Sequence, residues 1–156
     1  MILKRIIFLL AIACAIAQLH SRPSAQSQAA GEVSFKNLHQ LMEEGIHERF
    51  TFLSFTLWHD QPMTPEKMDA IAQSATQLRQ MAETIIALRP RYLEAERMKD
   101  DQKAFDERAA EFSRSAMMLA EAATSKDKAR AENLFGRLEA SCQSCHAKFN
   151  KALANK

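Results

Sequence analysis

The chain has 156 residues, with 21 Lys and Arg against 19 Asp and Glu, and it contains only three Gly and four Pro. This length fits one domain of ordinary size, and a composition rich in helix formers and poor in turn residues argues against a β-sheet protein or a disordered chain. A net charge this small gives no electrostatic reason to expect nucleic acid or an anionic membrane as a partner. We therefore expect a single all-α domain.

The first 30 residues differ in composition from the rest of the chain. Residues 1–5 include two positive charges, residues 6–17 form a short apolar run that ends in small residues, and residues 18–31 are polar and lack periodicity. This order is typical of an export signal, and the apolar run is too short to span a membrane. Loss of residues 1–17 would remove two basic and no acidic residues and leave 19 of each.

We predict that residues 1–30 are a signal peptide and flexible polar tract, cleaved near residue 17 or within residues 25–30, and that residues 31–156 form the folded domain. Cys14 lies inside the signal. The residues before it lack the large aliphatic side chain usually found three positions upstream in a bacterial lipid-attachment box. We therefore expect no lipid anchor at Cys14 and no membrane association beyond export.

Apolar residues at three- and four-residue steps predict four helices, of which the first runs from Ser34 to about Trp58. The second begins at Thr64, whose hydroxyl can cap a helix with Pro65 in its first turn. We predict that it ends at Pro90, because proline disfavours helical geometry in the residue before it.

Residues 90–101 are predicted to form a longer connection. The apolar pattern of a third helix extends over residues 105–123, and Ser125 is predicted to cap a fourth that runs through Phe149. Because two of the connections are short, neighbouring helices should be antiparallel, and the fold should be an antiparallel four-helix bundle.

The last helix carries Cys142, Cys145 and His146 as C-x-x-C-H, the haem c attachment signature. At about 100° per residue, all three fall within one arc of the helix. The two thiols can form thioethers with the vinyl groups of one haem, while the imidazole binds its iron. Leu138 and Phe149 lie in the same arc, so we expect them to pack against the porphyrin.

Three other uses of the cysteines fit the sequence less well. A structural zinc site would need a second pair of ligands, which the chain lacks, and a thioredoxin-like redox pair would need strands around it. A plain disulfide suits an exported protein, but none of the three explains a histidine directly after the second cysteine.

A helical bundle with an export signal and a single C-x-x-C-H on its last helix resembles the class II c-type cytochromes, the cytochrome c-prime family with its low-spin, methionine-ligated relatives. The likeness extends over nearly all of residues 33–152. It implies an antiparallel bundle with one covalent haem c between the helices, located in the periplasm. It also implies redox proteins as partners, and a homodimer is one expectation because family members often form one.

The family divides on what faces the iron opposite the histidine, which is either a methionine sulfur from the first helix or an open position beside a bulky apolar residue. Residues 39–42, His-Gln-Leu-Met, resemble the Gln-x-Leu-Met segment that carries this methionine, which implies that Met42 is the distal ligand. With about 100° per residue, Met42 falls in the middle of the buried stripe of the first helix. Leu38 falls beside it and is expected to pack against the haem.

Two alternatives to Met42 stay open. The glycine of the family lies four positions after the methionine, whereas Gly45 lies three after Met42 and four after Leu41. If Leu41 is the true counterpart, the iron has an open site beside a leucine. His39 lies about 60° from Met42 on the helix and is a third candidate ligand.

Many relatives have two arginines that meet the haem propionates, and at those positions this chain has Leu38 and Asn150. Arg49, Lys148 and Lys151 are the basic residues that we consider as replacements.

These features predict a periplasmic monohaem c-type cytochrome that transfers electrons through a haem ligated by His146 and Met42. The alternative is a five-coordinate haem protein that binds small gases such as NO or CO. Peroxidase catalysis would need acid–base groups beside an open iron, and only His39 could serve, so we expect the protein not to be an enzyme.

Overall fold

The computed structural model describes residues 35–150, and in that range it contains helices and no strand. The helical segments are α2 (Leu38–Gln40), the π-helix η2 (Leu41–His47), α3 (Glu48–Trp58), α4 (Pro65–Ala95), the short 3-10 helix η3 (Lys99–Asp101), α5 (Gln102–Thr124) and α6 (Lys128–Phe149). We call the continuous segment α2–η2–α3 the N-terminal arm. The predicted signal peptide, Cys14 and Lys151 lie outside the described residues.

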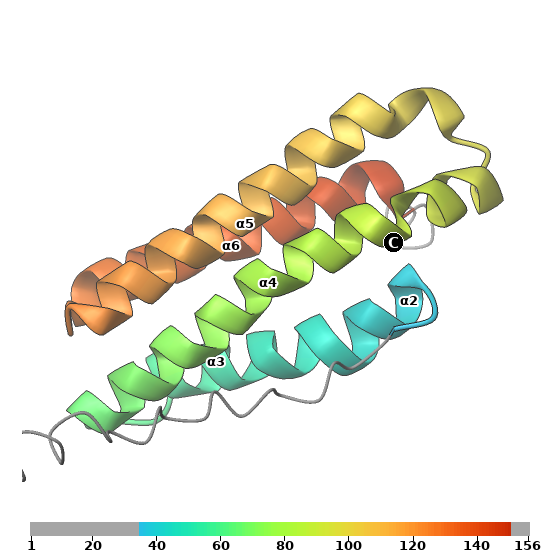
Figure 1. Ribbon diagram of the computed structural model, residues 1–156. Helices are drawn as coiled ribbons and strands as arrows, with labels where there is room; N and C mark the ends of the chain where they lie inside the picture. Colours follow the sequence, from blue (N-terminus) through green and yellow to red (C-terminus); the bar gives the residue numbers. More distant parts are fainter. Residues whose placement is uncertain (1–34, 151–156) are drawn as a thin grey trace, which may run out of the picture. The chain divides into compact units, whose positions relative to one another are not determined.

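The N-terminal arm, α4, α5 and α6 form a four-helix bundle in which each runs antiparallel to the one before it (Figure 1). Helix α5 packs against both α4 and α6, and α3 closes the bundle by contacting α4 and α6. The largest fully buried side chains are Phe105, Phe135, Leu41, Leu53, Leu57, Ile71, Leu78, Leu93, Leu119 and Leu138. The predicted all-α four-helix bundle is confirmed. Within residues 35–150, no helix combines the length and the apolar character that a membrane span requires.

Local capping sets where the helices begin, and one predicted cap is wrong. The Thr64 hydroxyl accepts a hydrogen bond from the Lys67 N–H, with Pro65 in the first turn, as predicted. Ser125 does not begin α6. Its hydroxyl donates to carbonyls of the last turn of α5, whereas the Asp127 carboxylate caps α6 by accepting from the Arg130 N–H.

The prediction that Pro90 ends the second helix is also wrong, because α4 continues through it to Ala95. Pro90 is exposed, and the residues beyond it make tertiary contacts, of which the burial of Leu93 is the clearest. The helix ends where Arg97 adopts a left-handed conformation with φ of 57° and the Met98 N–H bonds back to the Leu93 carbonyl. This is the geometry of a Schellman motif, so the predicted connection from residue 90 begins six residues too early.

The N-terminal arm is not the uninterrupted α-helix that its periodicity predicts. In η2 the hydrogen bonds span five residues instead of four, so each turn holds more residues and the side chains before it are rotated relative to those after it. The buried stripe of α3, which includes Leu53 and Leu57, is continued upstream by Ile46, Gly45 and Leu41. Met42 is half-buried and packs against the core, whereas Leu41 beside it is fully buried, so Leu41 and not Met42 lies deepest in the stripe.

Candidate functional site

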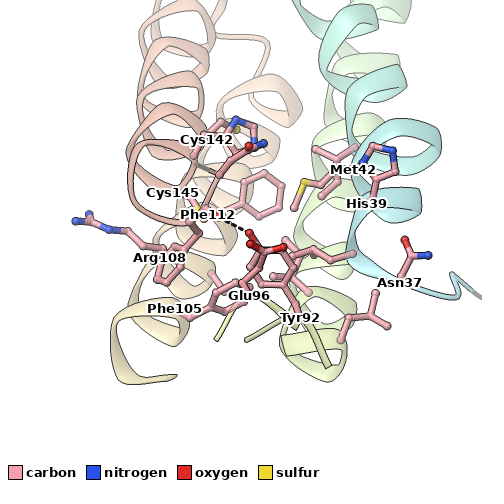
Figure 2. Close-up of a pocket in the computed structure, with 18 of the residues that line it drawn as sticks. Asn37, His39, Met42, Tyr92, Glu96, Phe105, Arg108, Phe112, Cys142 and Cys145 are labelled. Carbon is pink, nitrogen blue, oxygen red and sulfur yellow. Dashed lines mark hydrogen bonds between the residues drawn. The ribbon is translucent and has the colours of Figure 1, made fainter. Parts of the chain in front are cut away.

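The bundle holds a cavity of about 530 Å³, which lies within the size range of cofactor pockets, about 300–1,000 Å³. The N-terminal arm, α4, α5 and α6 all contribute to its lining (Figure 2). Much of the wall is apolar, and its apolar side chains include Ile85, Leu88, Phe105, Ala109 and Phe112. Such a wall suits a large, flat, mainly apolar molecule with a few polar contacts.

Helix α6 presents Cys142, Cys145 and His146 to this cavity. The two cysteines are one turn apart, which puts both on the same face of the helix. Both carry free thiols, so the two cysteines do not form a disulfide with each other. Two thiols and an imidazole therefore border one pocket.

Burial sets the protonation states of these groups. It raises the pKa of the Cys142 thiol to about 11 and also raises the pKa of Cys145, while it lowers the pKa of His146. At neutral pH the thiols keep their protons, and the imidazole is neutral. A neutral imidazole has a free nitrogen lone pair, which is the form that binds a metal.

Met42 and His39 line the cavity from the N-terminal arm, across from the helix that carries the two cysteines (Figure 2). The Met42 side chain is half-buried, and His39 is exposed at the edge of the pocket. Leu41 is fully buried in the core and is not among the lining residues. Of the candidates for the distal position, the structure brings Met42 and His39 to the cavity and does not bring Leu41.

Of the three residues expected to pack against a haem, the structure brings two to the cavity. Leu38 and Phe149 line the cavity, whereas Leu138 is fully buried elsewhere in the core and does not. Leu138 lies one turn before Cys142 on α6, whereas the part of this helix that lines the cavity begins at Ser141.

Tyr92 was not predicted as a site residue, yet it lines the cavity. Its hydroxyl donates a hydrogen bond to the Phe149 carbonyl, and its ring lies 5.9 Å from that of Phe105. Phe105 in turn meets Phe149 edge to face at 5.0 Å. The residue was missed because α4 was predicted to end at Pro90.

Two arginines at the cavity, Arg91 and Arg108, were also missed. Both are exposed, and neither makes a hydrogen bond or ion pair with another of the described residues. Two of the three predicted cations are engaged elsewhere, since Arg49 bonds to Gln77 and Gly45 and Lys148 pairs with Asp101. Arg108 follows Phe105 by three residues, so helical periodicity could have placed it at the site.

A sequence model of the family described as Cytochrome C' matches residues 67–150, which is more than half of the chain. The chain belongs to the cytochrome c′ family. Searches among curated proteins and among solved structures gave no significant match. The family resemblance stated from the sequence is therefore confirmed, and the protein is a c-type haem protein of a generally non-enzymatic family.

The residues present fit the covalent haem that the family implies. Free thiols, a neutral imidazole and an apolar wall meet at one cavity of suitable volume. The matched range includes Cys142, Cys145 and His146, whereas Met42 lies before it. Family membership thus supports a covalent haem, and ligation by methionine stays a prediction.

Proposed function

We propose that this cytochrome c′-family protein is an exported, periplasmic electron carrier with one haem c per chain. Cys142 and Cys145 would hold the haem through two thioether bonds, each made by adding an S–H group across a vinyl group, and this addition needs no oxidant because both thiols are free. His146 and Met42 would be the protein ligands of its iron. When bound, haem supplies a one-electron iron couple.

The observation that carries this proposal is the position of Met42. Its side chain lines the cavity opposite α6, while the competing Leu41 is fully buried away from it. A methionine thioether with a histidine raises the reduction potential of haem iron, as in electron-transfer cytochromes. Both ligands project from helices of one packed bundle, which limits how far they can move between oxidation states.

Periplasmic location rests on the amino-terminal export pattern and on the family, whose members are typically exported. An open distal face that binds NO or CO is the competing function. His39 borders the pocket, but an acid–base role for it would need an open iron, which methionine ligation removes.

The absorption spectrum of the purified holoprotein tests the proposal. We expect sharp low-spin bands in the oxidised and reduced states and little change when carbon monoxide is added to the reduced protein. High-spin bands together with rapid carbon monoxide binding would reject the electron-carrier proposal in favour of gas binding.

A further inference from the structure

The π-helix η2 begins one residue before Met42, and it lies tightly against α4. Gly45, inside η2, is buried. A Cβ atom at this position would lie 3.0 Å from Phe35 Cζ, 3.2 Å from Leu41 Cδ1 and 3.4 Å from the Met81 sulfur. The two closest atoms belong to the N-terminal arm itself, whereas Met81 on α4 lies at an ordinary contact distance. The lack of a side chain at residue 45 therefore lets Phe35 and Leu41 pack over the wide turn.

A second contact joins the same turn to α4. Arg49 donates from Nη1 to the Gly45 carbonyl at 2.9 Å and from Nε to the Gln77 side-chain oxygen, also at 2.9 Å. Gln77 and Met81 lie one turn apart on α4, so the face of α4 that bonds to Arg49 also lies next to Gly45. Hydrogen bonds from a part-buried guanidinium are stronger than those between neutral groups.

The wide turn decides which side chain faces the cavity. If an α-helix continued upstream from Leu53 at 3.6 residues per turn, its core-facing positions would fall at Ile46 and Met42. Ile46 is buried as this register requires, but one turn upstream Leu41 and not Met42 is fully buried. Met42 lines the cavity beside Ile46. The difference is about one residue of register, and it arises within η2.

We propose that η2, packed closely at Gly45 and held against α4 by the Arg49–Gln77 pair, is a register device: it sets the helix register so that Met42, and not Leu41, faces the iron. The proposal rests on the proposed function, because it takes Met42 to be the distal ligand. Gly45, Arg49 and Gln77 are positioning residues, since they act on the cavity through the backbone of the N-terminal arm.

Deletion of Glu44, an exposed residue of η2, tests the device directly because it removes one residue from the wide turn. We expect the turn to become α-helical, Met42 to rotate toward the core, and the low-spin fraction of the holoprotein to fall at least tenfold. Glu44→Ala is the matched control. It loses the same hydrogen bond from the Gln40 side chain but keeps the number of residues, and it should stay low-spin.

The methyl signal of Met42 provides a readout that does not depend on ligation. The holoprotein is labelled at its methionine methyl groups and kept in a diamagnetic ferrous state, with carbon monoxide added where the iron is high-spin. In this state the ring current of the porphyrin shifts the NMR signal of a nearby methyl group upfield. The signal is assigned by its loss in Met42→Leu. We expect a strong upfield shift in the wild type and in Glu44→Ala, and none in the deletion variant.

These measurements separate the two proposals. A high-spin wild type with an upfield Met42 methyl would reject methionine ligation and support the register device. An unshifted methyl in the wild type, or a shifted one in the folded deletion variant, would overturn the register device.

Should the deletion variant not fold, Arg49→Met replaces it, with exposed Arg79→Met on α4 as control. Arg49→Met should split the methyl signal into shifted and unshifted populations, and an unchanged signal would overturn the role of Arg49.

Discussion

Tyr92 on α4 donates a hydrogen bond from its hydroxyl to the backbone carbonyl of Phe149, the last residue of α6 and 57 residues further along the chain. Phe149 lies three residues after His146. The bond therefore ties the end of the haem-binding helix to the part of α4 that continues beyond Pro90. The rings of Tyr92, Phe105 and Phe149 pack together beneath it.

Tyr92→Phe should destabilise the holoprotein by about 1 kcal/mol, because it removes one part-buried hydrogen bond and keeps the ring. Urea unfolding measures this as a lower midpoint with an unchanged slope. Tyr92→Leu, which also loses the ring contact with Phe105, should cost more. Equal midpoints for the wild type and Tyr92→Phe would show that the hydroxyl contributes nothing to stability.

Burial raises the pKa of Tyr92 above its ordinary value of about 10. The folded state thus favours the neutral hydroxyl. Its contribution to stability is fully present below the ordinary pKa and is lost as pH rises through the raised one. Tyr92 is the only tyrosine in the sequence, so tyrosinate absorbance reports on it alone. We expect the folded protein to titrate at higher pH than the urea-unfolded protein, and coincident curves would contradict the burial of this hydroxyl.

The parts of the fold that the sequence predicts correctly have local causes. Thr64 and Pro65 mark the start of α4 by themselves, because capping depends on residues adjacent in the chain. The continuation of α4 past Pro90 depends instead on contacts made by Tyr92 and Leu93 with distant residues. Such tertiary contacts outweigh the local preference of proline, and no short sequence pattern reveals them.

In the candidate site, too, the sequence predicts the positions that have a local cause and misses those that depend on tertiary structure. Cys142, Cys145 and His146 could be placed on one wall because a single helix carries them and its geometry is regular. The orientation of Met42 could not, because the π-helix η2 interrupts the regular α-helical geometry at this residue. A π-helix places an extra residue in one turn, and a sequence pattern interpreted with a constant helical period does not reveal it.

Replacing Cys142 and Cys145 together by alanine should give a protein that contains no covalently attached haem. Both thiols border the cavity, and the chain has no other cysteine outside the amino-terminal signal pattern. Acid–acetone extraction of the purified variant should remove all of its haem, while the wild type keeps its haem. The variant should also be less stable, since an empty cavity in the bundle costs free energy. Haem that resists extraction from the double variant would contradict attachment through these residues.

Arg91 and Arg108 are the exposed cations at the cavity, and we expect them to interact with the haem propionates. Arg91→Gln with Arg108→Gln should lower the reduction potential by roughly 10–40 mV, because exposed ion pairs contribute about 0.2–1 kcal/mol. The difference should shrink at high ionic strength, where exposed charges are screened. Potentiometric titration at two salt concentrations measures both effects.

The control for this pair is Arg79→Gln with Arg137→Gln, two exposed arginines that do not line the cavity. The control carries the same change in net charge. If it lowered the potential as much as the first pair does, the effect would come from overall charge, and Arg91 and Arg108 would have no special relation to the propionates.

Met42→Leu should convert the low-spin haem to a high-spin form, lower the reduction potential and create carbon monoxide binding where the wild type has little. The reason is that leucine nearly keeps the volume of methionine but has no sulfur to donate to the iron. Met42→Ala should change the spectrum in the same way with a greater loss of stability, because it also leaves space beside the half-buried site. Absorption spectra, carbon monoxide titration and potentiometry of the two variants measure these effects.

His39 supplies the decisive control for Met42, because it is the other candidate ligand on the N-terminal arm that lines the cavity. If both Met42 variants stay low-spin, the ligand is not the methionine sulfur, and His39→Ala with Met42→Leu should then become high-spin. If the single Met42→Leu variant is already high-spin, adding His39→Ala should change neither the spin state nor the potential appreciably. The exposed position of His39 at the pocket edge favours the second result, since the imidazole would have to leave solvent to reach the iron.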